Sequence, residues 1–195
     1  KGRAAGTEVV TGPDVSHPVR RYLQDKIDDY VSVKDFGAKG DGVTDDTEAI
    51  QRALNRAYST AHSEALTNFH RTIYFPAGVY VITDTIYIPP FSKLQGEGKR
   101  TTLITGYFNG PLAQFADGLG NTGTLYGQPD AITNEDPEIA EYHFSDLAFV
   151  QQYTGYNQPC LVIDGGWTAT FNRVMFRGLT TGVRAEFGSL LTCSG

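Results

Sequence analysis

Two acidic residues offer the most specific chemistry in this sequence. Asp164 ends the run LVID and Glu186 ends the similar run VRAE, 22 residues later. If the runs stack as successive parallel strands, the two carboxylates project from one column about 5 Å apart. That distance is near the ~5–5.5 Å between the acids of a retaining glycosidase, one of which attacks while the other protonates the leaving oxygen. Asp164 and Glu186 are therefore the candidates for catalysis; the alternative is a pair of solvent-facing acids at strand ends.

A second acidic group, Asp41, Asp45 and Asp46, lies in the segment GDGVTDDTEAI. Clustered carboxylates suit Ca²⁺, but the spacing of a calcium loop is absent. Helix capping accounts for Asp45, whose carboxylate we expect to accept from the N–H three residues on, while Glu48 reaches back. Turn formation accounts for Asp41. The sequence predicts no metal site here.

The remaining reactive residue types give no cofactor or metal site either. The four histidines are scattered without ligand spacing, and we expect them to be exposed or hydrogen-bonded. The two cysteines, Cys160 and Cys193, are too few for a disulfide framework and are expected to be buried thiols. The glycines at 37, 40 and 42 match no phosphate-binding loop.

The composition of the chain limits the kinds of partner that it can bind. The chain has 195 residues, a net charge of −6 and 40% apolar residues, enough for one domain with a sizeable core. An acidic chain is poorly suited to phosphate or anionic lipid, and no apolar run approaches the ~20 residues of a membrane helix. We therefore expect no nucleic-acid partner and no membrane.

The elements that position these residues begin with two helices. Val19, Leu23, Ile27 and Tyr30 recur at helical spacing and predict a short amphipathic helix over 18–30, after a linker over 1–17. Val31 to Phe36 are expected to form a short strand. A longer helix follows over 45–61, and its predicted polar face is Gln51, Arg52, Asn55 and Arg56. Its predicted apolar stripe is Ala49, Ile50, Ala53, Leu54, Ala57, Tyr58 and Ala61.

The rest of the chain predicts stacked coils of short strands. Ile73–Phe75, Val79–Ile82 and Thr85–Ile88 are β-rich runs separated by proline and glycine. FSDLAF and FNRVMF share one pattern 27 residues apart, as LVID and VRAE do 22 apart. A period of this length indicates a solenoid in which each coil buries the apolar face of the preceding one. The first coil has no predecessor, so the helix over 45–61 is expected to cover it. We also expect C-terminal coils and a cap beyond residue 195.

Aromatic residues divide into two groups. Phe144, Phe149, Phe171 and Phe176 occupy repeat positions and are expected to form a stacked core ladder. Tyr153 and Trp167 adjoin glycine-rich stretches and are the expected surface aromatics, with ligand contact as one possible role.

The segments VKDFGAKGDGVTDDTEAIQRAL and IYFPAGVYVI resemble the opening of pectate-lyase-superfamily proteins, specifically over Val31–Gly98 and only in pattern over Phe144–Gly188. This resemblance implies an all-β right-handed parallel β-helix with an N-terminal capping helix, acting on polysaccharide. The segment 20–37 looks most like bacteriophage tailspikes and tail fibres, which are homotrimers whose short neck helix links a virion-binding head to the β-helix. Residues 31–195 would then be the N-terminal portion of the β-helix, and 1–17 the end of a head-binding element.

Three functions remain open on this resemblance. The first is a tailspike in the virion that binds and depolymerises a bacterial surface polysaccharide and contacts other tail proteins through its N-terminus. The second is a non-catalytic trimeric structural or adhesion component of a phage tail. The third is a secreted polysaccharidase like a polygalacturonase or glucanase. Whether the complete protein is a glycoside hydrolase or a polysaccharide lyase is not decided, since the family's catalytic acids lie on middle coils and no matching set occurs here.

Overall fold

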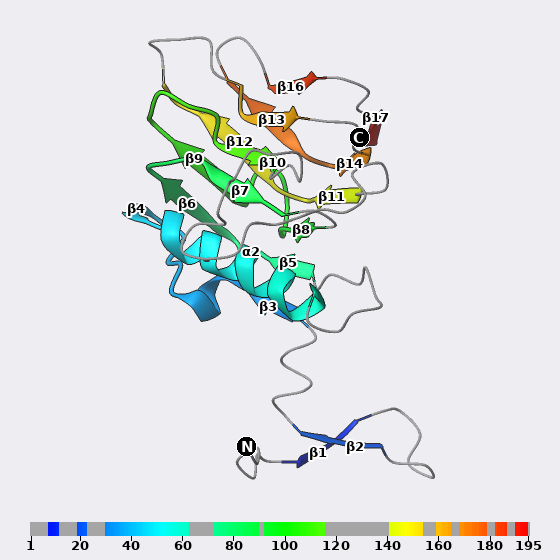
Figure 1. The fold of residues 1–195 in the computed structure, drawn as a ribbon. Helices are drawn as coiled ribbons and strands as arrows, with labels where there is room; N and C mark the ends of the chain where they lie inside the picture. The colour runs from blue at the N-terminus through cyan, green and yellow to red at the C-terminus, as the bar shows by residue number, and fades with distance from the viewer. Residues whose placement is uncertain are drawn as a thin grey trace.

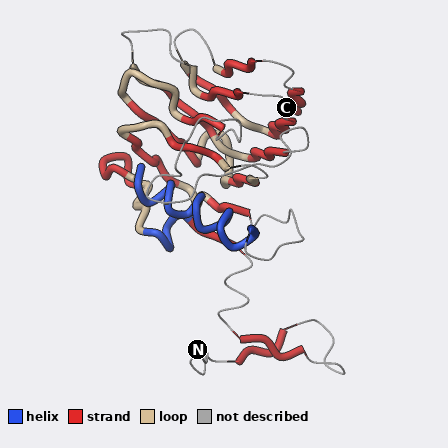
Figure 2. Tube along the Cα trace, in the orientation of Figure 1, coloured by secondary structure: helices blue, strands red, loops and turns tan. Residues whose placement is uncertain are grey.

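Three parallel sheets run side by side along one axis in the computed structural model of the chain (Figures 1 and 2). The structure describes residues 8–11, 19–22, 30–62, 72–89, 92–115, 141–153, 159–164, 168–178, 182–186 and 190–194. From β3 onward, consecutive strands belong to different sheets, and strands of neighbouring coils pair with one another. The result is a right-handed parallel β-helix, as the sequence predicted.

Each of the four coils from β5 to β16 takes one strand from every sheet, whereas the first coil, with β3 and β4, has no strand in the four-stranded sheet. The six-stranded sheet comprises β3 (Tyr30–Ser32), β5 (Thr72–Tyr74), β8 (Lys93–Gln95), β11 (Glu141–Ser145), β14 (Thr168–Asn172) and β17 (Leu190–Ser194). The five-stranded sheet comprises β4 (Asp41–Asp45), β6 (Gly78–Ile82), β9 (Thr102–Gly106), β12 (Ala148–Gln151) and β15 (Met175–Arg177). The four-stranded sheet comprises β7 (Ile86–Ile88), β10 (Ala113–Phe115), β13 (Leu161–Asp164) and β16 (Val183–Glu186).

The repeats found in the sequence occupy equivalent positions in the coils. Phe144 pairs in register with Phe171, and Phe149 with Phe176. Their rings stack with centroids 5.0 Å and 5.7 Å apart, so the predicted aromatic ladder is confirmed. Phe144, Phe149 and Phe171 are buried, and full burial of one such ring stabilises the stack by about 1.5–3 kcal/mol. The Cys160 thiol is buried beside this core, as expected.

Helix α2 (Thr47–His62) packs against the first coil, where the sequence placed the lid (Figure 1). Ala49, Ile50, Ala53, Leu54 and Ala57 are all buried, as the apolar stripe predicted. The side chains of Tyr58 and Ala61 lie outside the described part of the chain. Without this helix the apolar side chains of the first coil would face water.

The predicted polar face of α2 was wrong at two positions. Gln51 and Asn55 are buried, although both are polar. The Gln51 amide donates to the carbonyl of Tyr87 (2.9 Å) and to Oδ1 of Asn55 (3.0 Å), and its Oε1 accepts from the N–H of Tyr87 (2.8 Å). Strand β7 is the outermost of its sheet. Gln51 therefore pairs with the free edge of β7 as a neighbouring backbone would.

The predicted capping box also differs from the structure. The helix begins at Thr47, so the Asp45 carboxylate accepts from the N–H of that residue (3.0 Å) instead of Glu48. The carboxylate of Glu48 pairs with Arg52 one turn along the helix (2.6 Å). The Asp46 carboxylate accepts from the N–H groups of Lys39 (2.7 Å) and Gly40 (2.9 Å). Asp46, which the sequence left without a role, thus joins the glycine turn to the start of α2.

Asp41 has the turn-forming role predicted for it. Its Oδ1 accepts from the backbone N–H groups of Thr44 (2.8 Å) and Val43 (2.9 Å). These hydrogen bonds, together with one from the Thr44 hydroxyl, lower the pKa of Asp41 to about 2.

Two N-terminal predictions were wrong. Val19–Tyr22 is strand β2, where the sequence predicted the start of a neck helix over 18–30. It pairs antiparallel with β1 (Glu8–Thr11), which lies in the segment 1–17 that was expected to be a linker or the end of an upstream element. A thirteen-residue helix is marginal alone, while Val9, Val10 and Thr11 in β1 favour an extended partner. The rest of the expected helix, 23–29, lies outside the described residues. The strand predicted over Val31–Phe36 ends at Ser32, which caps the 3₁₀ helix η1 (Val33–Phe36).

Among the described residues, no helix combines the length and the apolar character needed to cross a membrane.

We predict that Gln51→Leu lowers the free energy of unfolding by about 1–3 kcal/mol, because the edge of β7 loses both hydrogen bonds in a buried site. Thermal or urea denaturation of the variant measures this change. The control is Glu48→Gln, which removes only an exposed ion pair with Arg52 and should cost about 0.5 kcal/mol or less. Equal stability of the two variants would show that α2 covers the stack by apolar packing alone.

Candidate functional site

The outer face of the six-stranded sheet bears the candidate site. Side chains pointing away from the core form two columns across β8, β11 and β14. One column is Lys93, His143 and Thr170, and the other is Gln95, Ser145 and Asn172. Strand pairing spaces successive members by about 4.8 Å. Ammonium, imidazole, hydroxyl and amide groups therefore repeat at a fixed interval along the axis.

A groove of about 570 Å³ lies over these columns. It is lined by Lys93, Gln95, His143, Phe144, Ser145, Asp146, Thr170, Asn172 and Arg173. Its size falls within the range of ligand sites. Most of its side chains both donate and accept hydrogen bonds, as a ligand rich in hydroxyl groups requires.

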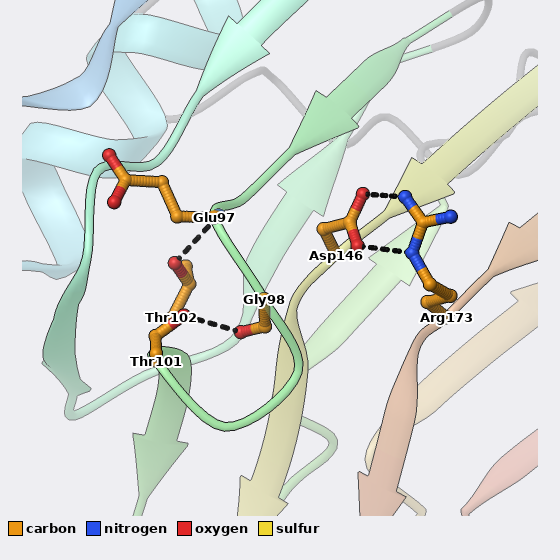
Figure 3. Close-up of polar contacts among 6 residues, drawn as sticks. All are labelled: Glu97, Gly98, Thr101, Thr102, Asp146 and Arg173. Atoms are coloured by element: carbon orange, nitrogen blue, oxygen red, sulfur yellow. Dashed lines mark hydrogen bonds and ion pairs between the residues drawn. The ribbon is translucent and has the colours of Figure 1, made fainter.

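Asp146 and Arg173 form an ion pair at one margin of the groove (Figure 3). Arg173 Nε and Nη2 each lie 2.6 Å from a carboxylate oxygen of Asp146. The hydrogen bonds from Arg173 hold the pKa of Asp146 below its usual value, although partial burial opposes the shift. A general acid requires a raised pKa, so Asp146 is unsuited to protonate a leaving group near neutral pH.

The same two residues occupy equivalent left-handed turns. Asp146 has φ 55° and Arg173 has φ 53°, each directly after its strand in the six-stranded sheet. The carbonyl of Asp146 also accepts from the N–H of Gly98 (2.7 Å), in the turn that follows β8. Asp146 therefore connects three successive coils, with its backbone on one side and its carboxylate on the other.

The turn after β8 is held by hydrogen bonds of its own (Figure 3). The Thr102 hydroxyl accepts from the N–H of Glu97 (3.0 Å), and the Thr101 hydroxyl donates to the carbonyl of Gly98 (3.2 Å). Gly96 in this turn has no room for a side chain, since a Cβ would lie 2.3 Å from the carbonyl oxygen of Asp146. The hydroxyl of Tyr74 donates to the Glu97 carboxylate, and this hydrogen bond raises the pKa of Tyr74.

The sequence-predicted acids lie on another sheet. Asp164 and Glu186 pair in register as the last residues of β13 and β16, in the four-stranded sheet. Their backbones are thus adjacent, while their side chains lie outside the described part of the chain. No groove-lining residue belongs to either strand. A catalytic role for the pair stays a prediction.

The sequence alone indicates no binding role for any groove residue. The matching patterns FSDLAF and FNRVMF place Ser145 over Asn172 and Asp146 over Arg173. The opposite charges of Asp146 and Arg173 at one repeat position were the signal in the sequence for an ion pair between coils. Of the histidines, His143 lies in the groove and is exposed, with Nε2 3.3 Å from a carboxylate oxygen of Glu141. Of the predicted surface aromatics, Tyr153 is half-buried, and Trp167 lies outside the described residues.

Parallel sheets stacked along one axis, with a polar groove on the outside, define the class of parallel β-helix proteins. The family model described as rhamnogalacturonase A/epimerase, pectate-lyase-like, matches residues 30–136, more than half of the chain. The chain belongs to this family.

Similar proteins come from fungi and from phages. The chain is 43% identical over 68 residues to a glucan 1,3-beta-glucosidase of Cochliobolus carbonum, covering 35% of this chain and 8% of that protein. It is 33% identical over 113 residues to the pre-neck appendage protein of Bacillus phage phi29, covering 57% of this chain and 11% of that protein. The chain therefore corresponds to about a tenth of the length of these relatives.

A solved structure from a phage has the same fold. The ORF18 protein of Geobacillus virus E2 superposes with a TM-score of 0.56 at 23% identity. The superposition covers 83% of this chain and 31% of that one. The relatives therefore include phage appendage proteins and enzymes named for polysaccharides, all larger than the present chain.

We predict that Asp146→Asn lowers the melting temperature at neutral pH by roughly 1–3 °C, because the exposed ion pair with Arg173 is lost. Asparagine tolerates the left-handed conformation, so the turn itself is retained. The folded protein holds the Asp146 proton less tightly than the unfolded chain. The stabilisation by the ionised Asp146 carboxylate is therefore complete above the unfolded pKa of about 3.9. It is lost as the pH falls through the lower pKa that Asp146 has in the folded protein.

Thermal scans of the wild type and Asp146→Asn across pH 2–7 measure the difference. The two curves should converge at the acidic end, and a difference that is independent of pH would contradict the assignment. Asp35→Asn, an exposed acid in η1, is the control and should leave the profile unchanged.

Proposed function

We propose that this chain is the N-terminal part of a phage tail protein that binds a bacterial surface polysaccharide. The observation that carries the proposal is the groove, in which polar side chains of three successive coils repeat along the β-helix axis. A polysaccharide is a repeating ligand rich in hydroxyl groups, and an extended chain lying along the axis would meet an equivalent set of donors and acceptors at each coil. The similarity to a phage appendage protein supports a place in the virion.

We further propose that the complete protein depolymerises this polysaccharide. The similarity to a glucan 1,3-beta-glucosidase supports an activity on polysaccharide. Within the described part of the groove, however, Asp146 is bound to Arg173 and its pKa is lowered. This observation favours binding over cleavage in the groove itself. A non-catalytic adhesion component of the tail is accordingly the second candidate function.

We predict that Lys93→Ala weakens binding of the host's surface polysaccharide about tenfold, a loss of ~1.4 kcal/mol, because the groove loses an exposed cation at its β8 end. Binding is measured by calorimetry on the intact protein, with purified capsular and O-antigen polysaccharides as probes. Lys99→Ala is the matched control, since Lys99 is exposed and does not line the groove. Wild-type affinity in Lys93→Ala would contradict the groove as the binding site.

We predict that Asp164→Asn and Glu186→Gln each reduce turnover by ~10³ or more if this pair is catalytic, since transition-state roles of this kind contribute several kcal/mol. Release of reducing ends or unsaturated sugars from the same polysaccharides is the measurement. Asp35→Asn is again the control. Activity within a few-fold of the wild type in both variants would rule out a catalytic role for the pair. Complete inactivity of the wild-type protein would favour the adhesion function.

We predict a homotrimer of the intact protein, with the β1–β2 hairpin close to the threefold axis. An isolated two-stranded hairpin is marginally stable in water, so it requires a partner. Light scattering should give three times the mass of one chain. A monomer mass that persists across concentrations would refute the trimer.

A further inference from the structure

A pair of tyrosines lies apart from the groove, at the carboxyl ends of two stacked strands. Tyr107 follows β9 and Tyr153 follows β12 two residues on, so they come from successive coils. Their ring centroids are 5.4 Å apart with an interplanar angle of 68°, an edge-to-face contact. Tyr107 is 66% exposed, which makes it one of the most exposed large hydrophobic side chains of the described residues. None of the groove-lining residues lies on these two strands.

The backbone beneath the pair is fixed by buried or partly buried polar groups. The Gln151 amide donates to the carbonyl of Gly110 (2.7 Å), and its Oε1 accepts from the N–H of Tyr153 (3.1 Å). Gln151 itself is buried, so one side chain holds both the segment that bears Tyr107 and the N–H of Tyr153. The Gln152 amide donates to the Thr105 hydroxyl (2.8 Å), a second link between the same coils.

A glycine sets the turn that presents Tyr107. A Cβ at Gly106 would lie 2.8 Å from the carbonyl oxygen of Ile82 and 2.7 Å from the ring of Phe108. A side chain at position 106 would therefore displace the Ile82 strand or the Phe108 ring, so this close approach requires glycine. Phe108 packs against the core while Tyr107 faces water, so the turn sends one ring inward and its neighbour outward. The exposed ring is thus preorganised, which reduces the entropy lost on binding.

The size and polarity of this site define its ligand. A fully buried aromatic side chain covers 150–250 Å², so two partly exposed rings offer far less than the ~800 Å² per partner of a stable protein interface. The segments 105–110 and 150–153 contain no charged residue, and Gln152 and Asn109 are exposed beside the rings in sequence. The site suits one small ring with an apolar face and hydroxyl groups at its edge.

From this arrangement, we propose that Tyr107 and Tyr153 form a second carbohydrate contact, in which the C–H face of a neutral pyranose stacks on the Tyr107 ring. This inference rests on the proposed polysaccharide binding and adds to it a subsite on a different sheet. The phenol of Tyr153 and the amide of Gln152 offer hydrogen bonds to the sugar hydroxyls. The two sites together would hold one polymer at two separated points, which raises its overall affinity beyond that of either site.

The test uses the intact protein with three defined probes: cellohexaose, laminarihexaose and hexagalacturonate. Saturation-transfer NMR detects magnetisation passing from tyrosine ring protons to sugar C–H groups, and calorimetry gives the affinity. We expect transfer to at least one neutral hexasaccharide, its loss in Tyr107→Ala, and about a tenfold weaker affinity in that variant. Tyr107→Phe should keep the affinity within a few-fold because the ring face remains. Tyr30→Ala, which removes an equally exposed tyrosine at the first coil, is the matched control.

The outcomes separate this inference from the proposed function. If Lys93→Ala weakens binding and Tyr107→Ala behaves as Tyr30→Ala does, the groove stands and the tyrosine subsite is overturned. If only Tyr107→Ala weakens binding, the tyrosine subsite is supported and the groove is rejected as a binding site. Absence of transfer to all three saccharides at about 1 mM overturns the subsite. A change of oligomeric mass in Tyr107→Ala also overturns it, since a second copy of the chain would then be the partner.

Discussion

A stack of parallel coils must protect its first coil, and the remaining structure depends on how this chain does so. Every later coil finds apolar side chains and backbone hydrogen-bonding groups on the coil before it, whereas the first finds only water. Helix α2 meets both needs. Its alanines, Ile50 and Leu54 cover the apolar surface, and Gln51 supplies the amide that β7 would otherwise find on a preceding strand. The Asp46 carboxylate fixes the start of this helix to the preceding glycine turn.

Once the first coil is closed, parallel register places side chains of equal orientation in columns. The inward columns become the aromatic ladder through Phe144 and Phe171, which holds the coils in alignment. The outward columns line the groove. Successive side chains along a strand point to opposite faces, so the residues next to each core residue face water in every coil. The packing that stabilises the fold thus also spaces the polar groups of the site. A shift of one residue in any coil would bury the polar column and expose the aromatic one.

The Asp146–Arg173 pair shows how the turns contribute to the same arrangement. Both residues adopt left-handed φ values that an ordinary side chain adopts at some energetic cost. The ion pair across the coils and the hydrogen bond from Gly98 offset this cost and keep the turns aligned at the margin of the groove. The same pairing lowers the pKa of Asp146, so this carboxyl group is unsuited to donate a proton near neutral pH.

The sequence by itself determined the β-helix, the lid and the register of β11 with β14 and β13 with β16, because these depend on local apolar periodicity and on repeats 22 and 27 residues apart. It did not reveal the groove, since Leu94 and its partner Phe144 are 50 residues apart and share no visible repeat. Likewise, helical spacing at Val19 did not reveal that β2 pairs with β1, and the polarity of Gln51 predicted exposure. For the groove and for Gln51 the deciding partner was distant in sequence, whereas for β2 it was a strand 8 to 14 residues away. Only the tertiary structure supplies such partners, because hydrogen bonds across coils depend on proximity in space and leave no period in the chain.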